Sequence, residues 1–164
     1  MHTLIGLMGP GETATETEID MAYALGAAIA QQGWALLTGG RAAGVMAAAS
    51  RGARAHQGLV VGILPDPDPT AMSSFVDIAI CTGMGQGRNV INVLSSQVIV
   101  ACGLGAGTLS EIALAIKLQK PLILMLVSPA MVRDLQKLSA AQIALVSEVD
   151  DAIAHIQQAL LLHP

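Results

Sequence analysis

Gln97-Val-Ile-Val-Ala-Cys-Gly-Leu-Gly-Ala-Gly-Thr-Leu-Ser-Glu111 is the stretch of sequence that decides the fold of this chain. An apolar run that ends at Cys102 is followed by a glycine-rich turn and then by the helix-forming run Ile112-Ala-Leu-Ala-Ile-Lys117. A buried strand, a glycine turn and a helix N-terminus in this order form an anion-binding site, because glycine lets backbone N–H groups approach a ligand and the first helical turn leaves N–H donors unpaired. The stretch predicts an α/β fold that binds a phosphate-bearing small molecule.

Length and composition limit the architecture. The chain has 164 residues, of which 53% are apolar and 12% are charged. This length favours one domain over residues 1–164. So apolar a composition is typical of a parallel sheet buried on both faces, of oligomer interfaces, or of both.

Several classes of partner are disfavoured. A net charge of −4, eight scattered basic residues and only three aromatic residues argue against nucleic acid binding. No apolar run approaches the roughly 18 residues of a membrane span, and the first residues lack the basic start of a signal peptide. The two cysteines and four histidines lack metal-ligand spacing, so no metal site of the protein's own is predicted. We expect a cytoplasmic protein that does not bind membranes.

Apolar β-type runs alternate with helical patterns along the whole chain. This alternation predicts an α/β protein with three layers, α/β/α, around a parallel sheet of about six to seven strands. The expected strands are 4–8, 34–38, 59–64, 76–81, 97–101, 121–127 and, more weakly, 143–146. The expected helices are 16–32, 44–56, 88–94, 109–118, 130–138 and 148–161.

The connection between the third and fourth expected strands is unusual. Three prolines on alternate residues in Pro65-Asp-Pro-Asp-Pro69 rule out a regular helix there. A crossover of a few strands remains possible only if the segment to Ser74 runs nearly straight. On that basis we expect the strand order 3-2-1-4-5, with the fourth strand beside the first.

Four of the first five expected strands end in glycine-rich loops. In a doubly wound sheet such loops meet at the carboxyl edge, where they surround a ligand crevice at the point at which the strand order reverses. The candidate ligand-binding residues in these loops are Gly9, Gly11, Gly39, Gly40, Arg41, Gly85, Arg88, Asn89, Gly105, Ala106, Gly107, Thr108 and Glu111.

The charged residues of these loops allow two interpretations. Arg88 lies at the N-terminus of an expected helix and Arg41 lies just before another. A cation there opposes the helix dipole unless an anion lies nearby, so both favour a bound anion. Thr108 and Glu111, in contrast, also fit a capping box, the same spacing as Thr15 and Glu18. For Glu111 alone the capping interpretation is slightly favoured.

Four segments in register resemble the molybdenum cofactor carrier protein family, which shares a Rossmann-like superfamily with the Lonely Guy cytokinin-activating phosphoribohydrolases. They are Thr38-Gly-Gly-Arg-Ala-Ala-Gly-Val-Met46, Gly87-Arg-Asn89, Gly105-Ala-Gly-Thr-Leu-Ser-Glu111 and Lys120-Pro-Leu-Ile123. The resemblance implies that molybdenum cofactor is bound through its phosphate and carried without covalent chemistry. It also implies molybdoenzymes or cofactor-synthesis proteins as partners and a homodimer or homotetramer.

The same resemblance implies an alternative. In a nucleoside 5′-monophosphate phosphoribohydrolase, Arg88 would hold the phosphate and Glu111 would be catalytic, stabilising an oxocarbenium-like state while the base departs. A nucleotide-sensing module is a third reading. Leu104, Arg41 and Asn89 depart from the hydrolase motifs, which have glycine, glycine and lysine there. These departures favour the carrier.

Two stripes could serve oligomer interfaces. Small residues at 47–49 and 53 permit close helix packing, and the last helix places Val149, Ile153, Ile156 and Leu160 on one side. Packing within one chain would produce the same stripes. The sequence leaves these alternatives open.

Overall fold

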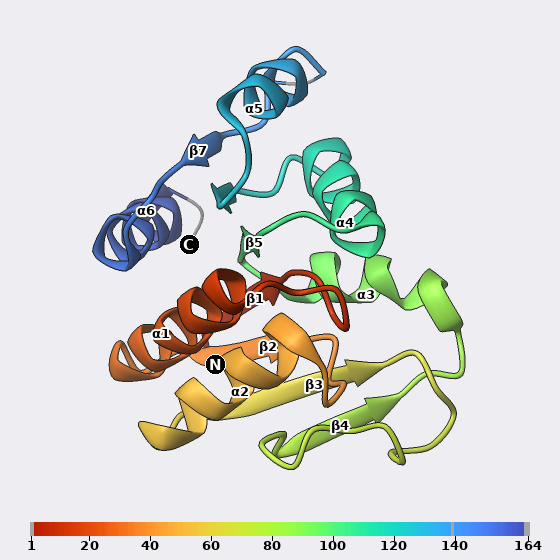
Figure 1. Ribbon diagram of the computed structural model, residues 1–164. Coiled ribbons are helices and arrows are strands. Elements are labelled where there is room, and N and C mark those ends of the chain that lie inside the picture. The colour runs from red at the N-terminus through yellow and green to blue at the C-terminus, as the bar shows by residue number, and fades with distance from the viewer. Residues whose placement is uncertain (1, 139, 163–164) are drawn as a thin grey trace.

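Seven parallel strands form one sheet at the centre of the computed structural model, which describes residues 2–138 and 140–162 (Figure 1). The strands are β1 (Leu4–Met8), β2 (Ala35–Thr38), β3 (Val60–Leu64), β4 (Ile78–Cys81), β5 (Val98–Cys102), β6 (Leu122–Met125) and β7 (Ile143–Leu145). Their order across the sheet is β4-β3-β2-β1-β5-β6-β7. The order reverses between β1 and β5, where Leu7 pairs with Val100. The α/β architecture with a parallel sheet is confirmed.

In the described part of the chain, six helices and one short 3-10 helix accompany the strands, and the last helix follows the last strand. The elements are α1 (Glu16–Gln31), α2 (Gly44–Ala55), η1 (Gly85–Arg88), α3 (Asn89–Ser95), α4 (Ala106–Lys117), α5 (Pro129–Gln136) and α6 (Val149–Leu162). The capping box predicted at Thr15 and Glu18 is present at the start of α1. Helix α4 begins three residues before the expected position, so the end of the glycine stretch is itself the first helical turn.

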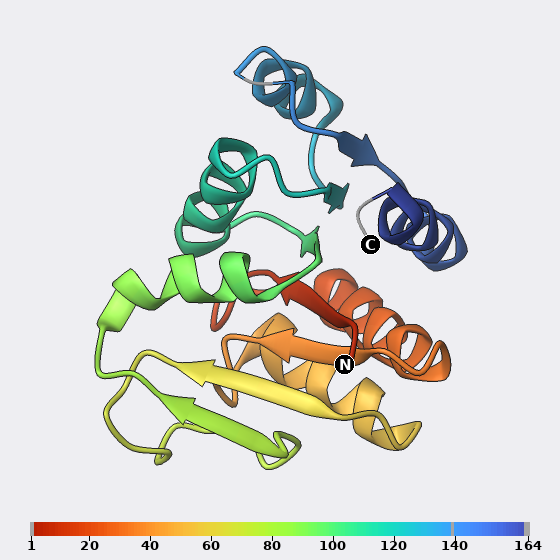
Figure 2. The same ribbon diagram turned by 180° about the vertical axis from the view of Figure 1, so that it is seen from behind.

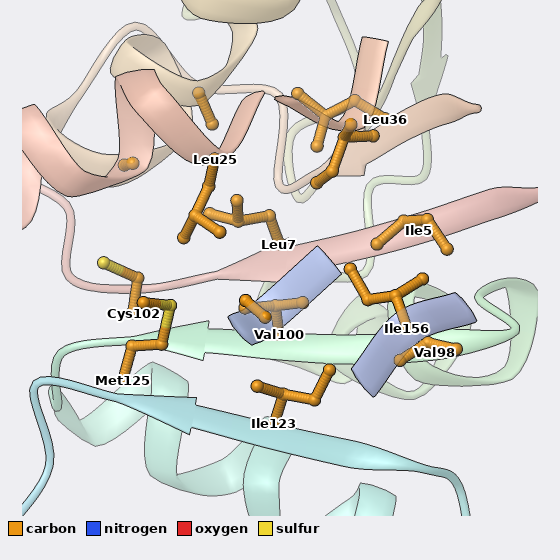
Figure 3. Close-up of a cluster of buried hydrophobic side chains, with 14 of the residues drawn as sticks. Ile5, Leu7, Leu25, Leu36, Val98, Val100, Cys102, Ile123, Met125 and Ile156 are labelled. Atoms are coloured by element: carbon orange, nitrogen blue, oxygen red, sulfur yellow. The ribbon is translucent and has the colours of Figure 1, made fainter. Parts of the chain in front are cut away.

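Alternate strand residues face two separate layers of helices. Ile5, Leu7 and Val100 pack with α1, α2 and α6 on one face, as Figure 3 shows for Leu25 and Ile156. Met8, Ile99 and the neighbouring apolar residues pack with α3, α4 and α5 on the other. Seen from behind in Figure 2, the strands β2 and β3 lie in front of α2. The central strands of the sheet are therefore buried on both faces, as their apolar sequences require.

The expected strand order is wrong at its fourth strand. Strand β4 lies at the edge of the sheet, paired with β3, and β5 takes the place beside β1 (Figure 1). The physical reason is the proline-rich segment, which contains no helix that could cross a face of the sheet. It folds back over the carboxyl edge instead, where Ser73 N–H donates to the Gly40 carbonyl and Ala42 N–H to the Ala71 carbonyl. Helix α3, after β4, then makes the crossover.

The stripes of small and apolar residues pack mainly inside the chain. Ala48, Ala49 and Ala53 of α2 are buried, and so are Ile153 and Ile156 of α6. Helices α1 and α2 cross so closely that a methyl group added at Gly26 or Gly52 would collide with a backbone carbonyl of the facing helix. Two edge positions differ: Ile78 and Ile80 of β4 remain 48% and 45% exposed. No helix in the described part of the chain is long and apolar enough to span a membrane.

Candidate functional site

A crevice of about 220 Å³ opens at the carboxyl edge of the sheet, around the point where the strand order reverses. The loop after β1 contributes Gly9 and Gly11, and the loop after β2 contributes Gly39 and Arg41. Residues at the start of α3 and α4 also line it. Because all strands are parallel, segments far apart in sequence meet here.

The start of α4 forms one wall of the crevice. Gly105 is the N-cap residue and makes no side-chain cap, so the N–H groups of the first turn have no side-chain acceptor there. The side chain of Thr108 is buried, and its Oγ1 has no hydrogen-bond partner within the described residues. An unpaired buried hydroxyl beside a helix N-terminus is suited to an oxyanion ligand, because both supply donors.

Arg88 and Glu111 form a buried ion pair in the second wall. Arg88 Nη1 lies 3.6 Å from Glu111 Oε1, and these side chains are 9% and 8% exposed. Arg88 Nη2 makes a long hydrogen bond of 3.5 Å to the Gly39 carbonyl, while its Nε has no partner among the described residues. Burial lowers the pKa of Arg88, and the charge of Glu111 opposes this effect. The guanidinium therefore has donor capacity left for a ligand.

Asn92 of α3 supports the carboxylate of Glu111. Its Nδ2 donates to Glu111 Oε1 over 2.7 Å, and its own Oδ1 is buried without a partner in the described structure. Burial raises the pKa of Glu111 to about 7, although the hydrogen bond from Asn92 and the charge of Arg88 both act to lower it. Glu111 consequently lies near its titration midpoint at neutral pH.

The raised pKa of Glu111 predicts a pH dependence of stability. A carboxyl whose pKa rises from 4.5 to about 7 on folding stabilises the protein below the lower value, and this contribution is lost as pH rises through the higher one. We expect this group alone to lower the free energy of unfolding by about 3 kcal/mol across that window. Denaturant titrations of wild type and Glu111→Gln at pH values on either side would show the slope in wild type only. Parallel profiles would contradict the prediction.

Arg41 is held by a carboxylate that sequence reasoning missed. Its Nη2 lies 3.1 Å and 3.0 Å from the two carboxylate oxygens of Asp66, and its Nε donates to Asp66 Oδ2 over 3.3 Å. Both side chains are partly exposed, so solvent screens the pair. Each arginine that the sequence places before a helix thus already has a carboxylate partner within the chain. The sequence did carry a signal for this contact: in Pro65-Asp-Pro an acidic residue follows β3, at the same carboxyl edge of the sheet as Arg41.

The structure gathers most of the predicted ligand residues around the crevice. Those that line it are Gly9, Gly11, Gly39, Arg41, Arg88, Asn89, Gly105, Ala106, Gly107, Thr108 and Glu111. Gly40 and Gly85 do not line it: each has a positive φ and shapes its loop instead. Gly40 packs against Gly62 of the neighbouring strand.

Further residues line the crevice without having been predicted. They are Leu7, Met8, Pro10, Thr13, Met46, Pro65 and Gln86. Most are apolar or neutral residues beside the glycine loops, and nothing in their spacing distinguishes them from ordinary core or loop residues. Asn92 was missed for a similar reason, because its position within a helix gives no sequence signal of a contact with Glu111.

The capping interpretation of Thr108 and Glu111 is wrong. Helix α4 begins at Ala106, so both residues lie inside it, and its N-cap residue Gly105 has no side chain. Glu111 contacts Asn92 and Arg88 instead of a backbone N–H at the helix start. Among the described residues there is also no group of three or more histidine, cysteine or acidic side chains that could hold a metal ion.

The chain is similar in sequence and in structure to proteins that are already known. The SLOG cluster4 family model matches residues 2–153. The structure of the molybdenum cofactor binding protein from Rippkaea orientalis is 49% identical, with 98% of each chain covered and a TM-score of 0.95. The molybdenum cofactor carrier protein of Chlamydomonas reinhardtii is 42% identical, with 98% of this chain and 99% of that chain covered and a TM-score of 0.92.

A second kind of relative is more distant. The cytokinin riboside 5′-monophosphate phosphoribohydrolase of Mycobacterium marinum is 34% identical over 97 residues. The match covers 57% of this chain and 51% of that enzyme.

Proposed function

From the premise that this chain belongs to the SLOG cluster4 family and to the molybdenum cofactor carrier proteins, we propose that it binds molybdenum cofactor through its phosphate and carries it without covalent chemistry. The observation that carries the proposal is the set of unused donors in one crevice. Thr108 Oγ1 and Arg88 Nε are both buried and unpaired within the described residues, beside the N-terminus of α4. A phosphate there would accept from all three sources.

We assign the binding roles residue by residue. Gly105, Ala106, Gly107 and Thr108 hold the phosphate, while Gly9, Gly11, Gly39, Arg41, Arg88, Asn89 and Glu111 line the remaining crevice. Arg41, fixed by Asp66, offers a second cationic group to an extended anionic ligand. The molybdenum is cargo, held through the ligand, and no protein side chain has to coordinate it.

The phosphoribohydrolase remains a second candidate because one observation favours it. Arg88 and Glu111 lie together beside the anion site, as a phosphate-binding cation and a carboxylate near a ribose would. Leu104, at the hydrolase's glycine position, is 38% exposed on the loop before α4 and argues against the close ligand approach that glycine permits.

One experiment separates carrier from hydrolase. We expect mass spectrometry of the purified protein to detect a molybdopterin-type ligand, and incubation with AMP to release no adenine. The physical basis is that the site offers hydrogen-bond donors to a phosphate, whereas Leu104 stands where the hydrolase motif has a glycine. A known phosphoribohydrolase serves as the positive control for base release. Adenine release that Glu111→Ala abolishes would establish the hydrolase instead.

Assembly and location are further parts of the proposal. The exposed apolar side chains Ile78 and Ile80 on the uncovered edge strand β4, with Met84 after it, support contact with a second copy as a homodimer or homotetramer. Light scattering would decide this. The free thiols Cys81 and Cys102 support a reducing, cytoplasmic location, where molybdoenzymes or cofactor-synthesis proteins could exchange the cofactor.

A further inference from the structure

A buried carboxylate lies inside the anion site, and carrying a phosphate ligand gives it no function. Thr108 and Glu111 are three residues apart on α4, so they share one side of that helix, and both line the crevice. An oxyanion held by the first turn of α4 and by Thr108 would therefore lie close to a group of its own sign. Like charges at close range in a site shielded from water repel each other strongly.

When Glu111 is ionised, the charges of the crevice are balanced before a ligand enters. Among the described residues that line it, only Arg41, Arg88 and Glu111 carry charge. Asp66 neutralises Arg41 and Glu111 neutralises Arg88, as the two ion pairs show. A dianion would therefore bring two uncompensated negative charges into the crevice unless one carboxylate became neutral.

We propose that Glu111 takes up one proton from the solvent when an oxyanion binds, and then faces the anion as a hydrogen-bond donor. The inference rests on the proposed phosphate-binding function of the same crevice. The proton adds to a carboxylate oxygen, and the resulting O–H donates to an oxygen of the anion. No bond of the ligand forms or breaks. Arg88, released from its partner, becomes fully available to the anion.

The surroundings of Glu111 suit this change of state. Asn92 of α3 donates to Oε1, whereas the structure gives Oε2 no hydrogen-bond partner among the described residues. Among the described residues, Arg88 at the end of η1 is the one charged group in contact with Glu111. Arg41 and Asp66 lie beyond Arg88, and the sulfur of Met8 of β1 lies near Asn92. Burial already brings the pKa of Glu111 to about 7, so protonation near neutral pH requires little free energy.

Glu111 is more deeply buried than Asp66, the other carboxylate near the site. The side chain of Asp66 is 33% exposed and that of Glu111 only 8%. Solvent therefore screens the effect of a bound anion on Asp66, whereas the buried Glu111 feels it nearly unscreened. The proton should go to the buried group.

Isothermal titration calorimetry with sulfate tests the proposal directly. Sulfate remains a dianion near neutral pH, so any proton taken up on binding must be bound by the protein. Titrations at about pH 8 in two buffers of different ionisation enthalpy should give uptake of about one proton per sulfate. The affinity should fall about fivefold between pH 7 and pH 8, and by close to tenfold for each further pH unit. Uptake of no proton would overturn the proposal.

Two matched variants locate the proton. In Glu111→Gln, whose amide imitates the neutral acid, proton uptake and the fall of affinity with pH should both disappear. In Asp66→Asn, which removes the other carboxylate, proton uptake should persist. The reverse pattern would overturn the assignment to Glu111. If wild-type protein binds no sulfate at any pH, the anion site itself is wrong and the proposed function falls with the inference, whereas binding without proton uptake contradicts the inference alone.

Discussion

Arg88→Gln is expected to lower the affinity for molybdenum cofactor by about 100-fold. The guanidinium is buried at the crevice, and its Nε has no partner in the part of the chain that the structure describes. A hydrogen bond from a charged group to a phosphate contributes about 1.5–3 kcal/mol. At about 1.4 kcal/mol for each factor of ten, the upper end of that range gives the stated loss. Equilibrium binding of cofactor released from a molybdoenzyme, with the pterin quantified by mass spectrometry, measures it.

A matched control separates this loss from general effects of charge. Arg133→Gln removes the same charge from an exposed position on α5, away from the crevice, and should leave binding as in wild type. Because Arg88→Gln also leaves Glu111 without its cation, circular dichroism should first establish that the variant is folded. Wild-type affinity in a folded Arg88→Gln variant would remove Arg88 from the binding site.

Gly52→Ala is expected to produce a large loss of stability. The added methyl group would collide with the backbone carbonyl of Tyr23, and helices α1 and α2 cannot move apart without opening the core beneath them. Overpacking against backbone should lower the free energy of unfolding by about 3 kcal/mol. In a domain of this size the melting temperature should then fall by roughly 6–12 °C. Thermal and urea unfolding of the ligand-free protein measure the change.

Gly107→Ala is the matched control for this substitution. Gly107 also lies in a helix, but an added methyl group meets no atom within 4 Å. Since alanine favours a helix over glycine, the variant should be as stable as wild type or slightly more stable. If both variants lose the same amount of stability, the close crossing of α1 and α2 is not the cause of the loss. If Gly52→Ala is as stable as wild type, helices α1 and α2 can move apart more easily than their close contact indicates.

Much of the fold followed from local patterns. An apolar run such as 97–101 becomes a buried strand, and a helical pattern such as 16–32 becomes a helix packed on the sheet. Because each pattern is local, the positions of these elements in the chain could be predicted. The place of β4 could not, because it depends on how a proline-rich segment without a helix returns to the sheet. The boundary of α4 was missed for a related reason: glycines suited to a loop also occupy its first helical turn.

The candidate site divides in the same way. Sequence alone predicted an anion site after β5, because backbone N–H groups in one contiguous stretch build such a site, and it placed further glycine loops at the same sheet edge, where the structure has them line one crevice. Only the tertiary structure decided that Arg41 meets Asp66, that Arg88 meets Glu111, and that Asn92 supports the latter. These contacts join segments that are far apart in the sequence, and strand order and helix packing set the distance between them. Which arginine is neutralised by which carboxylate depends on that distance, so it could not be read from the sequence.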